Sequence, residues 1–108
     1  MNEKPLRPRQ SQRLPVSAAV RVNGSAGLAH EGTLSNISAE GCCVSFTGTM
    51  PDRGALVVLR LEGLESLDCT VRWSRDRQVG LEFRRRLYGP VVEHLRARHG
   101  HSVSVATD

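Results

Sequence analysis

Apolar and polar side chains alternate with a period of two along much of the sequence between residues 16 and 83, and this pattern limits what the chain can fold into. The clearest run is VSAAVRV, residues 16–22, where every second residue starting at Val16 is apolar. Such alternation is typical of a strand with one face buried and the other in water. We therefore expect a mainly β fold in which strands bury their apolar faces together.

The same rhythm returns between stretches rich in turn-forming residues, such as NGSAG and MPDRG. We expect five further strands, at residues 30–37, 42–47, 55–62, 67–74 and 79–84. About six short strands, with turns roughly every 8–12 residues, are typical of a small antiparallel barrel or sandwich. Within 67–74, Trp73 continues the apolar alternation, so we expect its side chain to pack in the core.

The end of the chain has a different pattern. YGPVVEHLRARHG places Pro90 where a first helical turn would begin and Gly100 where a helix would stop. We expect a helix of about ten residues that covers one open end of the barrel. The predicted organisation is a basic, flexible arm over residues 1–13, a barrel with its C-terminal helix over residues 14–100, and a disordered tail over residues 101–108.

Positive charge is concentrated on the arm. The chain has a net charge of +4, and residues 1–21 carry five basic groups against one acidic group, while the rest of the chain is balanced. Fourteen of the fifteen cations are arginine, whose planar fork suits phosphates and guanine edges better than the point charge of lysine. The arm also lacks an apolar face that could pack. An anionic partner is therefore expected there.

The cysteines and the apolar runs bear on the cell compartment. Cys42, Cys43 and Cys69 form no CxxC pattern, so we expect buried, reduced thiols. Residues 1–12 contain no apolar stretch, and we expect no signal peptide. The longest apolar run, ALVVL, is too short to cross a bilayer. A cytoplasmic protein without membrane contact is the expectation.

Signals for catalysis are weak. The histidines do not have metal-ligand spacing, no serine has an evident His/Asp pair, and no phosphate-binding glycine loop is present; the histidines are His30, His94, His99 and His101. We therefore expect no catalytic residue, no metal site and no cofactor. The prediction is that the chain is not an enzyme.

Two stretches favour a ligand site. RQSQR carries arginines at Arg9 and Arg13, which could grip one ligand from two sides. NISAEG carries Asn36, Ser38 and Gly41; alternation predicts that Asn36 and Ser38 share one side of a strand end, and glycine permits a bend or a close backbone approach. By itself NISAEG is also consistent with a simple strand-ending turn.

The order and spacing of these stretches, followed by RWSRDRQVGLEF and a helix, resemble the PilZ domain family over roughly residues 7–100. The resemblance implies a six-stranded antiparallel β-barrel with a C-terminal α-helix that binds the bacterial second messenger cyclic di-GMP. It implies that Arg9 and Arg13 hold guanine edges and phosphates. It also implies that Asn36, Ser38 and the backbone around Gly41 contact the other side of the ligand.

The residue chemistry fits this ligand. Arginine can donate two parallel hydrogen bonds to guanine O6 and N7, and asparagine carries both a donor and an acceptor for a guanine edge. Cyclic di-GMP has two guanines and two phosphates, so it needs several such groups. An arm that cannot pack alone would then order on binding the ligand. A domain without an output module would relay the signal to an effector protein in motility, attachment or polysaccharide export.

Several points stay open in the sequence. Many relatives carry another arginine or an apolar residue where this chain has Pro8, which leaves the number of bound ligands undecided, and Arg7 could substitute. Arg84–Arg86 could extend the basic surface. One alternative is a ligand-independent adaptor whose arm docks on an acidic protein. Another is a basic nucleic-acid-binding barrel, although four aromatic residues provide few stacking platforms, and we expect no nucleic-acid partner.

Overall fold

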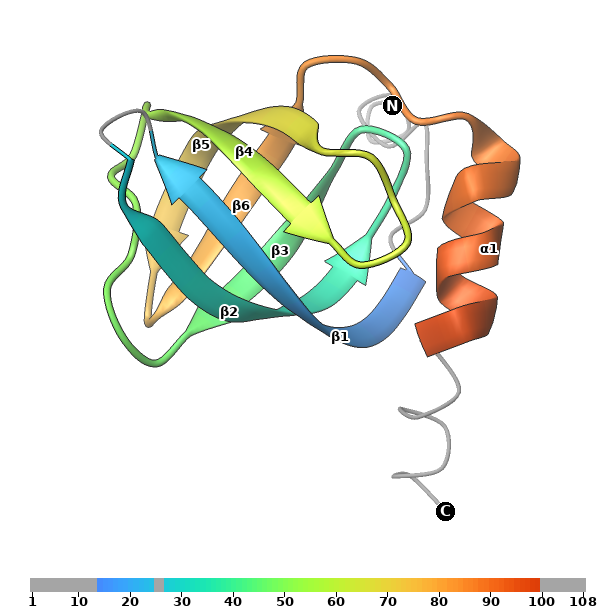
Figure 1. Cartoon of the computed structure of the whole chain (residues 1–108), viewed down its shortest axis with the longest axis horizontal. Coiled ribbons are helices and arrows are strands. Elements are labelled where there is room, and N and C mark those ends of the chain that lie inside the picture. Colours follow the sequence, from blue (N-terminus) through green and yellow to red (C-terminus); the bar gives the residue numbers. More distant parts are fainter. Residues whose placement is uncertain (1–13, 25–26, 100–108) are drawn as a thin grey trace, which may run out of the picture.

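The computed structural model describes residues 14–24 and 27–99; the predicted arm and tail lie outside these ranges. Six antiparallel strands close into a barrel in the order β1-β2-β3-β6-β5-β4, with β4 paired to β1 (Figure 1). The strands and the helix are β1 (Leu14–Gly24), β2 (Ala29–Ile37), β3 (Gly41–Phe46), β4 (Leu56–Leu61), β5 (Leu67–Arg75), β6 (Gln78–Phe83) and α1 (Gly89–His99). The predicted barrel with a C-terminal helix is confirmed.

The alternating residues line the inside of the barrel, as expected. Val22, Leu34 and Val44 are fully buried there, and Leu59 and Leu81 are nearly so. Burying a side chain of this size contributes about 1.5–3 kcal/mol, so the inner face supplies most of the stabilisation. Closure also removes free strand edges, since each strand pairs on both sides.

The helix α1 stands across the end of the barrel where β1 begins (Figure 1). Its side chains Val92 and Leu95 are buried and belong to the same hydrophobic cluster as the barrel interior. Pro90 lies in the first turn, where its missing N–H costs nothing. The expected role of the helix as a cover for one end is confirmed.

Three strands contain a β-bulge, between Pro15 and Ala18, between Leu34 and Asn36, and between Val71 and Trp73. A bulge inserts one extra residue into a strand and moves the following side chain to the other face. The expectation that Trp73 packs in the core is therefore wrong. Beyond the bulge Trp73 pairs with Gly80 on the outer face, and the residue is 36% exposed.

The hairpin between β5 and β6 turns through Asp76 and Arg77, as the RDRQ stretch predicts. Both residues have positive φ, 51° and 66°, as in the tight turns that match the twist of paired strands. The Arg77 Nε donates to the carbonyl oxygen of Phe46 at 3.2 Å, and the Phe46 N–H donates to the Arg77 carbonyl at 2.8 Å. These bonds anchor the hairpin to the end of β3.

Candidate functional site

The NISAEG stretch forms the end of β2, a turn, and the first residue of β3. Ile37 is the last residue of β2 and is fully buried, so it fixes this strand end in the core. The Ser38 N–H donates to the carbonyl of Gly41 at 2.8 Å, which closes the turn. Ser38 thus lies beyond the strand, where side-chain alternation no longer applies.

The Ser38 hydroxyl is built into this turn. Its Oγ accepts hydrogen bonds from the backbone N–H groups of Glu40 at 3.2 Å and Gly41 at 3.3 Å. The residue is 2% exposed. Serine is favoured at such positions because its short side chain satisfies nearby backbone donors. Ser38 therefore shapes the backbone of the NISAEG turn.

Gly41 is required by the approach of β3 to β6. A Cβ at this position would lie 2.2 Å from the carbonyl oxygen of Leu81, a backbone atom that cannot move aside cheaply. The close backbone approach expected at Gly41 is thus found, against the neighbouring strand. The turn is held further by Phe83, whose N–H donates to the Glu40 carbonyl at 2.8 Å, and by Leu87, whose N–H donates to the Ala39 carbonyl at 2.8 Å.

Asn36 lies on the outside of the barrel in a row of residues that crosses four strands. The register pairs Asn36 with Cys43, Cys43 with Gly80, and Gly80 with Trp73. Paired residues of adjacent strands face the same side, and the neighbouring pair Ile37–Cys42 faces the core. Asn36, Cys43, Gly80 and Trp73 form what we call the outer row.

The indole of Trp73 lies over Gly80 at the far end of the outer row. A Cβ on Gly80 would come within 2.1 Å of the indole Nε1, so the ring occupies the space that a larger residue would fill. The Arg75 guanidinium carbon lies 6.0 Å from the ring centroid, within the range of a cation–π contact. The apolar alternation in the sequence gives no signal for the bulge, so it does not predict that Trp73 and Gly80 lie on the outer face.

The N-terminal start of β1 lies at the opposite end of the outer row. Pro15 pairs with Asn36, and Leu14 pairs with Ile37. Arg9 and Arg13 lie outside the described residues. Covalent geometry nevertheless limits their reach: Arg13 is one peptide bond from Leu14, so their Cα atoms are about 3.8 Å apart, and Arg9 is within roughly 17 Å of Leu14. Both arginines are therefore joined by a short stretch of chain to the strand that pairs with Asn36.

The three consecutive arginines after β6 have different surroundings. Arg86 forms an ion pair with Glu40, in the turn of the motif. Arg84 forms one with Asp68 on β5 at 3.9 Å, and Arg85 is exposed. Of the three, Arg86 is the one that the structure places beside NISAEG.

The described residues also include three cysteines and His30, whose side chains can be reactive. All three cysteines are buried and free, and burial raises the pKa of Cys69 to about 12, which keeps its thiol protonated. His30 is buried and lies 2.7 Å from the Thr49 hydroxyl.

Among residues 14–24 and 27–99 no cluster of three or more His, Cys, Asp or Glu side chains could hold a metal ion. The one helix of this part of the chain is too short and too polar to span a membrane.

Comparison with known proteins gives a consistent picture. A family model described as "PilZ domain" matches residues 7–97. No curated protein matches the chain. Two solved structures share the fold. The PilZ domain of CeSA from a cellulose-synthesizing bacterium has a TM-score of 0.57 and 19% identity, with 82% of this chain and 93% of that chain covered.

The second solved structure is the Bacillus subtilis inhibitor of motility, MotI/DgrA. It has a TM-score of 0.57 and 22% identity, and the match covers 81% of this chain and 47% of that chain. The present chain thus corresponds to about half of that protein. At this level of identity the two neighbours establish the fold.

Proposed function

Because the chain belongs to the PilZ domain family, a family of cyclic di-GMP receptors, we propose that it is a non-catalytic receptor for cyclic di-GMP in the bacterial cytoplasm. We further propose that binding is relayed to an effector protein. The observation that carries the proposal is the outer row. It places Asn36 beside the attachment point of the Arg9–Arg13 arm and ends at an exposed indole.

In the proposed complex each group has a distinct task. Arg9 and Arg13 bind guanine edges and phosphates, which needs the planar fork and the permanent charge of arginine. Asn36 pairs with a guanine edge through its amide. The turn at Ser38 and Gly41 holds the end of β2 and the start of β3 in a fixed geometry beside Asn36. The arm orders on binding, and its loss of conformational entropy reduces the net affinity.

Trp73 adds a stacking surface to this assignment. Its ring is exposed and shares the outer face with Asn36, with Gly80 beneath it and the Arg75 guanidinium over it, 6.0 Å from the ring centroid. Stacking of a base on an aromatic ring contributes about 1–3 kcal/mol. We propose that one guanine of the ligand stacks on Trp73.

The chain contains a single tryptophan, so its fluorescence reports on this site alone. Titration with cyclic di-GMP should quench and saturate the Trp73 emission, while GTP and cyclic di-AMP should leave it unchanged. Unchanged emission with all three nucleotides would contradict the stacking proposal. Equal quenching by all three would contradict the proposed selectivity.

The relay to a partner is supported by membership of the PilZ domain family. One structural neighbour comes from a CeSA protein of a cellulose-synthesizing bacterium and the other is an inhibitor of motility. Motility, attachment and exopolysaccharide control are therefore the processes in which we propose a role. No nucleic-acid partner is proposed, because the outer row carries only one aromatic ring.

A further inference from the structure

The face of the Trp73 ring that is turned away from Gly80 lies beneath the guanidinium of Arg75. The opposite face is closed, because the ring lies over Gly80 so closely that an added Cβ would come within 2.1 Å of the indole Nε1. The Arg75 guanidinium carbon lies 6.0 Å from the ring centroid. A base that stacks on Trp73 must therefore either displace Arg75 or enter between the guanidinium and the ring.

The separation of the two groups favours entry between them. Stacked bases follow one another at about 3.4 Å, so a base with a neighbour on each face needs about 6.8 Å between those neighbours. The distance of 6.0 Å between guanidinium carbon and ring centroid is already close to this value. A small rotation of the long arginine side chain is enough to admit a base, and the guanidinium then covers its second face.

The Arg75 side chain is not held by any other contact in the part of the chain that the structure describes. Its partner across the hairpin is Gln78, whose Oε1 accepts a long hydrogen bond from the Cys43 thiol at 4.0 Å and does not contact the guanidinium. Among residues 14–24 and 27–99 the contact with the Trp73 ring is the one interaction of the Arg75 side chain. The guanidinium can therefore move onto a ligand without breaking an ion pair.

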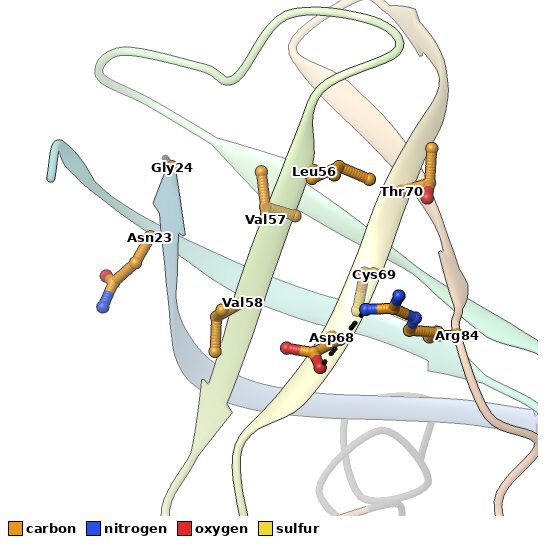
Figure 2. A pocket seen from close by; sticks show the side chains of 9 residues that line it. All are labelled: Asn23, Gly24, Leu56, Val57, Val58, Asp68, Cys69, Thr70 and Arg84. Atoms are coloured by element: carbon orange, nitrogen blue, oxygen red, sulfur yellow. Dashed lines mark ion pairs between the residues drawn. The ribbon is translucent and has the colours of Figure 1, made fainter. Parts of the chain in front are cut away.

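Two other arginines of the same region are paired with carboxylates. Arg72 on β5 forms an ion pair with Glu82 at 2.9 Å. Arg84, which follows β6, forms one with Asp68 at 3.9 Å beside a pocket in the wall of the barrel, where Figure 2 shows the two side chains directed toward each other. Arg75 differs from both, because its charge is available to compensate that of an anionic ligand.

We infer that the base stacked on Trp73 is held in a slot, with the indole on one face and the Arg75 guanidinium on the other. This inference rests on the proposed function and adds a binding residue to its site. A planar guanidinium stacks on a base, and its charge attracts the phosphates of the same ligand. Lysine cannot replace it, because an ammonium group has the charge without the flat face.

The test is isothermal titration of cyclic di-GMP into the wild type, Arg75→Ala and Arg75→Lys. Both variants should bind about tenfold more weakly than the wild type, because both lose the stacked guanidinium. The matched control is Arg60→Ala on β4, which removes the same charge from another exposed arginine and should keep the wild-type affinity. Wild-type affinity in Arg75→Ala would overturn the slot. Wild-type affinity in Arg75→Lys would also overturn it, because charge alone would then be sufficient.

A second comparison separates a contact with the base from a role in orienting the ring. In a Trp73→Ala background, Arg75→Ala should still weaken binding several-fold, since the guanidinium contacts the base itself. No further loss in the double variant would show that Arg75 acts only through Trp73, and the slot would be wrong. Both side chains are on the surface, so the variants should fold, and thermal melting checks this.

The outcomes for the slot and for the receptor function can be told apart. Absence of binding by the folded wild type would contradict the receptor function and, with it, the slot. Selective binding by the wild type, with unchanged affinity in the Arg75 variants, would overturn the slot alone and leave the receptor function standing.

Discussion

The indole ring of Trp73 occupies the space over Gly80, so that a Cβ on this glycine would lie 2.1 Å from the indole Nε1. The clashing atoms belong to a surface side chain, which can rotate away. A larger residue at this position should therefore displace the ring without unfolding the barrel. The contact makes the orientation of Trp73 dependent on a residue in the neighbouring strand.

Gly80→Ala should weaken cyclic di-GMP binding by about tenfold, because the displaced ring no longer offers its face to a base. Tryptophan emission in the free protein should shift to longer wavelength as the ring becomes more exposed. The matched control is Gly48→Ala, where an added Cβ meets nothing within 4 Å. Wild-type affinity in Gly80→Ala, with a shifted emission, would exclude a stacking role for Trp73.

Gly41→Ala should lower the free energy of unfolding by about 2 kcal/mol or more, because the added methyl group meets the backbone oxygen of Leu81 and forces β3 from β6. Urea denaturation measures this loss. Gly89→Ala, at the start of α1 and with open space around it, should leave the stability unchanged or slightly higher. Equal free energies of unfolding in the two variants would contradict this, because they would show that β3 can move away from β6 at little energetic cost.

Ser38→Ala should lower the free energy of unfolding by about 1–3 kcal/mol in the absence of ligand, because the N–H groups of Glu40 and Gly41 lose a buried acceptor. Hydrogen exchange of these two amides should accelerate at the same time. If the variant kept full stability and lost only cyclic di-GMP affinity, the hydroxyl would act on the ligand directly and not through the turn.

Cys69 should make stability fall at high pH. Burial, and secondarily the nearby Asp68 carboxylate, raises the pKa of this thiol from 9.0 to about 12, while a backbone hydrogen bond from Leu59 acts in the opposite direction. Because the folded state holds the proton more tightly than the unfolded state, the contribution is complete below pH 9.0 and is lost as the pH rises toward about 12. Cys69→Val should show a smaller decrease in unfolding free energy between these limits.

The barrel itself could be predicted from the sequence because its strands bury one face, and period-two alternation reports that directly. Val79, Leu81 and Phe83 show this in β6, where all three are buried. The position of Trp73 could not be predicted. Its bulge is set by the register of β5 against β6 across the hairpin, which adds one residue without changing the apolar alternation.

The site could be predicted only in part for the same reason. Asn36 is on the outer face opposite Ile37, as alternation indicates. Ser38 follows the last residue of β2, and its hydroxyl is used by the turn, which spacing alone does not reveal. The roles of Arg9 and Arg13 rest on the family motif and on their tether to Leu14, and they stay predictions.

The central claim is that the arm and the outer row bind cyclic di-GMP, and isothermal titration of the wild type and of Arg13→Ala tests it most directly. The account predicts selective binding of cyclic di-GMP over GTP and cyclic di-AMP by the wild type. Loss of one charge-assisted contact, about 1.5–3 kcal/mol, predicts a decrease of about tenfold to a hundredfold or more in Arg13→Ala. Absence of binding by the folded wild type, or equal affinity in Arg13→Ala, would contradict it.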